Sequence, residues 1–142
     1  MVIRGNKFIG GRLEEKLVSL IDIPKTLMSS AGCHTEIQGR DLHNIGDDKW
    51  ENAVYIQISE SFVGRAIRTD RYKYVVYDPC KNPWNESKSN CYREKYLFDL
   101  QQDPLEKNNL INNPSCISIK AALRKRLIEF ANQACEGEID II

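Results

Sequence analysis

The chain has 142 residues, and its 20 lysine and arginine residues balance 20 aspartate and glutamate residues, so the formal net charge at pH 7 is zero. This length fits one domain, or a small domain plus part of another, and it can bury a hydrophobic core. The composition lacks the basic excess of a typical nucleic-acid-binding protein. No apolar run approaches membrane-spanning length, and the N-terminus has no apolar core of a secretory signal, so we expect neither a nucleic-acid nor a membrane partner and leave the localisation unknown.

The N-terminal part of the chain predicts a short strand, a helix and a polar connecting loop. Residues 1–5 (MVIRG) have the character of a short apolar strand. Residues 22–31 predict a helix, because Asp22 can cap its N-terminus and Gly32 stands where a left-handed C-cap belongs. We expect the buried face of this helix to carry three apolar side chains: Ile23, Leu27 and Met28.

The middle of the chain predicts three antiparallel strands. Residues 53–59 (AVYIQIS) alternate, which places Val54, Ile56 and Ile58 on one face of a half-buried strand. Residues 65–77 alternate as well, with Asp70 and Arg71 as a tight hairpin connection. The three tyrosines of this hairpin fit the pleat as strand formers, so they need not form a stacking platform, and we expect its basic residues on the solvent-facing side and at the strand ends.

The last part of the chain predicts a fourth strand and a long helix. Residues 94–100 (EKYLFDL) predict a strand with Tyr96, Phe98 and Leu100 on one face, and turn residues follow it. Asn113 or Ser115 can cap the next helix. Its apolar positions follow helical spacing: Ile119, Leu123, Leu127, Phe130, Ala131 and Ala134. The tail from residue 136 is predicted to be frayed. The fold class is therefore α+β, a four-stranded antiparallel sheet with a C-terminal helix packed on it.

Residue patterns alone indicate no active site. The chain has no G-x-S-x-G motif, phosphate-binding glycine loop or H-E-x-x-H motif, and we expect His34 and His43 to be exposed, solvated imidazoles. None of the five cysteines is spaced as C-x-x-C, so no structural zinc site is predicted. Cys80 and Cys91 bracket a polar segment that a disulfide could close, although free thiols in a reducing compartment fit equally well.

Four short segments, in chain order, carry a family resemblance. They are LVSLIDIPKTLMSSAG (17–32), IQGRDL (37–42), GRAIRTDRYKYVVY (64–77) and EKYLFDLQQDPLEKNNL (94–110). Together they resemble the C-terminal third of a formylglycine-dependent sulfatase of the alkaline phosphatase superfamily. The likeness covers about residues 1 to 135.

The resemblance implies catalytic groups that this sequence does not contain. Sulfatases of this family use a formylglycine made from Cys or Ser in a C-x-P-S-R or S-x-P-S-R motif, with a calcium ion and Lys, His and Arg groups around the sulfate. None of the five cysteines begins that motif. No catalytic or metal-binding residue is therefore carried over to this chain. We expect no cofactor in this chain, whereas calcium and formylglycine are implied for the intact parent enzyme.

The resemblance also predicts a division of the chain. Residues 1–49 resemble a strand and a helix at the end of the large α/β sulfatase domain plus a connecting loop, and residues 50–142 resemble the C-terminal antiparallel-sheet subdomain. Met1 is then expected to be an internal methionine used as a start, as in a split, truncated or fragmentary gene. The expected partner is a missing N-terminal sulfatase half or a second copy of the chain.

The predicted function is that of a C-terminal fragment of a sulfatase-like sulfuric ester hydrolase, not catalytic alone. The alternatives are a stand-alone binding module for a sulfated glycan or protein partner, and a piece that complements a separate N-terminal half. In the intact parent, which would take a sulfated small molecule or glycan, Glu60 and Arg65 are candidate substrate-binding residues, since an arginine could pair with a sulfate. The alternative for Arg65 is a solvated position on a strand.

Overall fold

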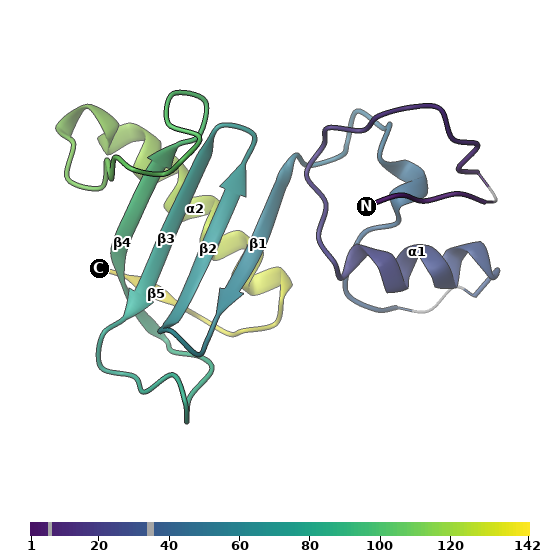
Figure 1. Ribbon diagram of the computed structural model, residues 1–142. Helices are drawn as coiled ribbons and strands as arrows, with labels where there is room; N and C mark the ends of the chain where they lie inside the picture. Colours follow the sequence, from purple (N-terminus) through teal and green to yellow (C-terminus); the bar gives the residue numbers. More distant parts are fainter. Residues whose placement is uncertain (6, 34–35) are drawn as a thin grey trace. The chain divides into compact units, whose positions relative to one another are not determined.

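The computed structural model of the chain describes residues 1–5, 7–33 and 36–142, so the expectation for His34 lies outside the described residues. The chain forms two compact units, Met1–Asn52 and Ala53–Ile142 (Figure 1), and each is described by itself. Within the described ranges, no helix has both the length and the apolar character needed to cross a membrane.

The second unit is built on a five-stranded sheet. Its strands are β1 (Ala53–Ile58), β2 (Val63–Thr69), β3 (Tyr72–Asp78), β4 (Cys91–Asp99) and β5 (Asp140–Ile141), and they lie in chain order (Figure 1). The first four pair antiparallel, whereas β5 runs parallel to β4. The predicted α+β class is therefore confirmed, with one strand more than expected.

The β2–β3 connection is the tight hairpin that the sequence predicts. Arg68 pairs with Lys73, so the chain reverses around Asp70 and Arg71. The Thr69 hydroxyl accepts a hydrogen bond from the Tyr72 backbone N–H at 2.8 Å. This side-chain contact closes a turn that lacks the glycine such hairpins prefer.

The C-terminal tail is ordered, which corrects the expectation of a frayed end. The backbone N–H groups of Asp140 and Ile142 donate to the carbonyls of Asn90 and Tyr92, both at 2.8 Å. Ile139 is 5% and Ile141 8% exposed. β4 begins at Cys91, three residues earlier than predicted. These extra residues offer backbone groups at the edge of the sheet, and the tail pairs with them.

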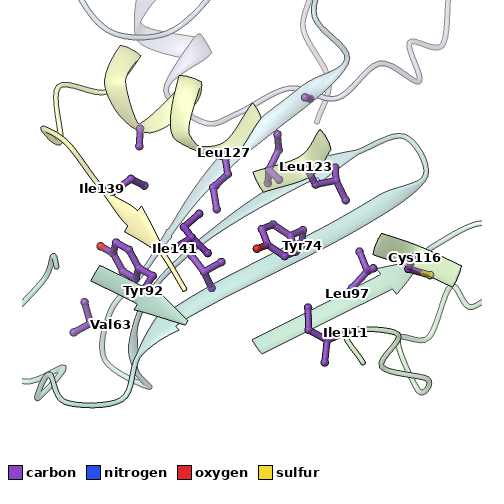
Figure 2. Packing of buried hydrophobic residues seen from close by; sticks show 14 residues of the cluster. Val63, Tyr74, Tyr92, Leu97, Ile111, Cys116, Leu123, Leu127, Ile139 and Ile141 are labelled. Carbon is purple, nitrogen blue, oxygen red and sulfur yellow. The ribbon is translucent and has the colours of Figure 1, made fainter. Parts of the chain in front are cut away.

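One face of the sheet is covered by the helix α2 (Ile117–Gln133), preceded by the short 3-10 turn η2 (Pro114–Cys116) (Figure 1). The Asn113 side chain accepts from the Ser115 N–H and so caps η2, whereas the N-cap of α2 is Cys116, which has no side-chain cap hydrogen bond. Figure 2 shows Leu123 and Leu127 pointing from α2 toward the sheet. The principal buried residues of this core are Val63, Ile67, Tyr74, Val76, Tyr92, Leu97, Leu123, Leu127 and Ala131.

Two strands present to α2 the face opposite to the predicted one. In β1, Ala53 and Tyr55 lie toward the helix, and the Tyr55 ring stacks on Phe130 at 6.4 Å between centroids. In β4, Leu97 is fully buried in the core that also contains Leu123 and Leu127, while Tyr96 remains 37% exposed. Apolar residues line both faces of this sheet, so alternation alone could not tell which face the helix covers.

The first unit contains the helix α1 (Asp22–Ser30) and the 3-10 turn η1 (Leu42–Asn44). The predicted helix is confirmed, and Gly32 follows it with φ +74°. The predicted strand at residues 1–5 is not formed, because its only pairing among the described residues is an isolated bridge between Gly5 and Phe8. A strand without a neighbour leaves its backbone groups unpaired, which explains its absence.

Asp22 holds this unit together from a buried position, not from the predicted cap position. Its carboxylate accepts hydrogen bonds from the backbone N–H groups of Ser19 and Arg40 and from the Arg40 guanidinium, at 2.7–3.0 Å. The Thr26 hydroxyl donates to the Asp22 carbonyl and accepts from the Leu42 N–H. The predicted apolar stripe of α1 is found only in part: Ile23 and Met28 are half-buried, whereas Leu27 is 64% exposed. The fully buried residues of the helix are Asp22 and Thr26.

Candidate functional site

A buried ion pair joins β2 to the segment that follows α2. The Arg65 Nε lies 2.9 and 2.7 Å from the two carboxylate oxygens of Glu136. The two side chains are 2% and 6% exposed. The carboxylate also accepts a hydrogen bond from the Gln57 amide of β1. Both charges are thus withdrawn from water and satisfied by each other and by neighbouring polar groups.

The rest of the Arg65 guanidinium is used for backbone contacts. Nη1 donates to the Gly64 carbonyl at 2.7 Å, and Nη2 donates to the Ser87 carbonyl at 3.1 Å. The guanidinium carbon lies 5.8 Å from the centre of the Tyr92 ring. Arg65 therefore ties β2 to the end of the chain and to the loop between β3 and β4.

The environment shifts the pKa values of both partners in the direction that keeps the pair charged. Burial opposes ionisation of Glu136, but hydrogen bonds from Arg65 and Gln57 outweigh it and hold the pKa of this carboxyl below its ordinary range. Burial likewise disfavours the charged Arg65, yet the Glu136 carboxylate raises the pKa of the guanidinium above its ordinary value.

The two predicted substrate-binding residues have different surroundings. Glu60 lies in the exposed connection between β1 and β2, with φ +78°. Arg65 is buried, so the alternative that placed it on a solvated strand face is wrong. The described residues show no hydrogen bond or ion pair between these two side chains. The partner of Arg65 stands 71 positions later in the chain, and no local pattern in the tail marks Glu136 for this role.

Other basic residues of the β2–β3 hairpin also have carboxylate partners. Arg71 Nη2 lies 2.8 Å from Asp99, and Lys73 Nζ lies 2.7 Å from Glu106. Tyr74 is fully buried, and its hydroxyl donates to Glu94. These tyrosine and basic side chains therefore serve packing and pairing within the unit, as expected for a sheet hairpin.

The polar loop of residues 79–90 is held by its own hydrogen bonds and ion pair. Cys80 and Cys91, the possible disulfide pair, are exposed free thiols in this structure. The buried Ser89 hydroxyl donates to Asp78, and Lys81 forms an ion pair with Glu86. The loop is thus closed without a covalent link.

His43 is not the solvated imidazole that the sequence suggests. Its side chain is 4% exposed, and Nδ1 lies 2.7 Å from an Asp41 carboxylate oxygen. The Phe8 ring stacks on the imidazole at 4.7 Å between centroids. Among the described residues, no three His, Cys, Asp or Glu side chains converge on a point where they could hold a metal ion.

Comparison with protein families gives a match over nearly the whole chain. Residues 1–133 match the family described as N-sulphoglucosamine sulphohydrolase, C-terminal. A curated relative, the ulvan-active sulfatase of Formosa agariphila, is 28% identical over 163 aligned positions, which cover 91% of this chain and 31% of the relative. The chain therefore spans about a third of the length of this relative.

Solved structures show the same fold at lower sequence identity. BT4656, solved in complex with its substrate D-glucosamine-2-N,6-O-disulfate, is 21% identical with a TM-score of 0.66, covering 82% of this chain and 24% of that chain. The putative sulfatase YidJ from Bacteroides fragilis is 21% identical with a TM-score of 0.58, covering 78% of this chain and 24% of that chain. The sheet and helix of the second unit are thus an arrangement also found in much longer chains.

Proposed function

Because this chain belongs to the family of sulfatase C-terminal domains described for N-sulphoglucosamine sulphohydrolase, we propose that it is the C-terminal part of a sulfuric ester hydrolase and does not hydrolyse sulfate esters alone. The observation that carries this proposal is the family match over residues 1–133 of a chain that spans only 31% of the curated relative. The remaining two-thirds of such a relative has no counterpart in this sequence.

The catalytic groups of the proposed enzyme lie outside this sequence. When present, a hydrated formylglycine would supply the nucleophile, and a calcium ion would stabilise the charge that develops on the sulfate oxygens. We assign no residue of this chain to calcium. The contribution of this chain is structural support and contact with substrate.

We assign the first unit to the end of the large α/β sulfatase domain. Many of its large apolar side chains are exposed: Met1, Val2, Ile9, Leu13, Leu20, Ile21 and Leu27. Burying one such side chain contributes about 1.5–3 kcal/mol, so a surface of this kind favours association. The partner we propose is the rest of the sulfatase polypeptide, and self-association is the outcome expected when that part is missing.

The proposed substrate class of the complete enzyme is a sulfated saccharide. The names of the two relatives, one active on ulvan and one bound to a disulfated glucosamine, support this class. Glu60 is exposed and remains a candidate for direct substrate contact. Arg65 is fully engaged by Glu136, Gly64 and Ser87, so in this proposal it positions the neighbouring loops.

The purified chain tests the proposal directly. We expect no turnover of 4-nitrophenyl sulfate above a mock-purified control, with an intact sulfatase as the positive control. Turnover that rises in proportion to the concentration of the chain would contradict the proposal. A second test is the DNA upstream of the Met1 codon: an open frame that encodes C-x-P-S-R or S-x-P-S-R, co-expressed with this chain, should yield a complex that hydrolyses the ester.

A further inference from the structure

The loop between β3 and β4, residues 79–90, presents an exposed tryptophan. The loop projects beyond the end of the sheet (Figure 1). Trp84 is 81% exposed, although tryptophan is among the side chains that gain most from burial. The other tryptophan, Trp50, is half-buried in the first unit, where its ring lies under the Arg40 guanidinium.

The exposure of Trp84 does not result from a loose backbone. The Asn82 side chain accepts from the Trp84 N–H at 3.0 Å, and the Asn82 carbonyl accepts from the N–H groups of Asn85 and Glu86 at 3.1 and 2.9 Å. The Lys81–Glu86 ion pair closes the same turn. The turn that carries Trp84 is therefore an ordered one, and its indole is exposed to water.

A shallow hollow of about 600 Å³, which Trp84 does not line, lies in the same loop. Its lining includes the 86–91 segment, with its serine, asparagine and lysine side chains, together with Asp78 and Lys81. The carboxylate of Asp78 is already satisfied by the Ser89 hydroxyl and the Cys80 N–H. Lys81 is paired, whereas Lys88 is exposed and has no ion-pair partner among the described residues.

We propose that this loop is a saccharide-binding element in which the Trp84 indole stacks on the C–H face of a sugar ring and Lys88 pairs with a sulfate of the same ligand. The inference rests on the proposed function for the ligand class. An indole offers an apolar face with a polar N–H at its edge, and an ammonium forms charge-assisted hydrogen bonds with sulfate oxygens.

The surroundings of Trp84 favour a saccharide over a protein partner. Contiguous exposed apolar patches larger than a few hundred Å² often mark protein-binding surfaces. Trp84 instead lies among Asn82, Asn85 and Ser87, which are exposed hydrogen-bonding side chains. The loop thus carries one exposed aromatic ring, exposed amide and hydroxyl side chains and, four positions after Trp84, the exposed cation Lys88. These groups match in kind the C–H faces, hydroxyls and sulfates of a sulfated sugar.

The two tryptophan indole N–H resonances provide the test. The ¹⁵N-labelled chain is titrated with D-glucosamine-2-N,6-O-disulfate and, separately, with unsulfated D-glucosamine, and the Trp84 resonance is assigned by its loss in Trp84→Phe. We expect a saturable shift of the Trp84 resonance with the disulfate, a weaker one with glucosamine, and no shift for Trp50. The absence of a saturable Trp84 shift with either sugar would overturn the proposal.

Matched variants separate the two contacts. Trp84→Ala should weaken disulfate binding at least about tenfold, and Trp84→Phe should weaken it less, because an aromatic face remains. Lys88→Ala should lower affinity for the disulfate but not for glucosamine. Leu105→Ala, at a residue that is 73% exposed in another loop, should change neither. Unchanged binding by Trp84→Ala, with an unchanged circular dichroism spectrum, would refute the assignment.

The result is independent of the hydrolysis assay. Turnover of 4-nitrophenyl sulfate by the chain alone would contradict the proposed function and leave the Trp84 titration interpretable. A failed titration beside an inactive chain would remove the loop assignment and leave the proposed function in place.

Discussion

The buried ion pair between Arg65 and Glu136 gives the sharpest prediction for stability. Glu136→Ala removes a carboxylate whose two oxygens lie 2.9 and 2.7 Å from the Arg65 Nε. The Glu136 side chain is only 6% exposed. Arg65, itself 2% exposed, then keeps its hydrogen bonds to the carbonyls of Gly64 and Ser87 but has no countercharge among the described residues. Removing one partner of a buried pair typically destabilises a protein by 3–5 kcal/mol, so we expect a loss of about 4 kcal/mol.

A loss of this size is large against a total stability of about 5–15 kcal/mol for a typical domain. The double variant Arg65→Met/Glu136→Leu should lose much less than the sum of the single changes Arg65→Met and Glu136→Leu, because neither charge is left buried alone. Lys125→Ala is the matched control. Its partner Glu129 lies 3.9 Å away on the exposed side of α2, and such surface pairs contribute about 0–1 kcal/mol.

The same pair predicts a pH dependence. The folded-state pKa of Glu136 lies below its ordinary value, so in acid the unfolded chain binds the proton more readily than the folded chain does. The stabilisation is therefore fully present above the ordinary glutamate pKa of about 4.3 and is lost as the pH falls through the lower folded-state value. The Glu136→Ala variant should lack this part of the acid destabilisation.

Urea unfolding followed by circular dichroism measures both effects, with m-values compared among the variants to confirm that the same transition is observed. A loss below about 1 kcal/mol for Glu136→Ala would refute the reasoning, and so would strict additivity of the two single changes. Either result would mean that the pair is open to water in solution.

Two further predictions concern the tail and the first unit. Ile141→Asp should lower the free energy of unfolding of the second unit by about 2–4 kcal/mol, because it places a charge where an 8%-exposed apolar side chain packs. Urea unfolding measures this loss, and an unchanged midpoint would show that β5 is not formed. In hydrogen exchange, residues 1 to about 45 should be less protected than residues 50–135, since Leu42 and Ile45 are the only buried apolar residues described in the first unit. Equal protection of the two segments in a dilute monomer would contradict the proposed division of the chain.

Much of the second unit could be predicted from local patterns. The burial of β2 does not alternate as predicted, since every residue of this strand except Arg68 is buried. The places of β2 and β3 along the chain, the two-residue hairpin and the helical spacing of Leu123 and Leu127 do appear as expected. The order of motifs also identified the family, which the match over residues 1–133 confirms. These features depend on neighbours a few positions apart, so the sequence carries them directly.

The candidate site was less predictable, because its contacts join distant parts of the chain. The sequence marks Arg65 as a candidate binding residue, but its partner Glu136 lies in a tail for which the sequence predicts no structure. His43 was expected in water, yet Asp41 and Phe8 enclose its ring. The neighbouring residues in the sequence do not indicate whether side chains such as Arg65 and His43 are exposed or buried, so only the fold decides this.

The fold class, the helices, the hairpin and the sulfatase family can be predicted from the sequence, because periodicity, turn residues and motif order are local properties of the chain. Tertiary structure decided which face of the sheet α2 covers, since both faces carry apolar residues such as Tyr55 and Ile56. It also decided that the tail pairs with β4 and brings Glu136 to Arg65. A buried charge needs a countercharge or hydrogen-bonding partners to be stable. For Arg65 the countercharge is Glu136, 71 positions later in the chain, and only the fold brings the two together.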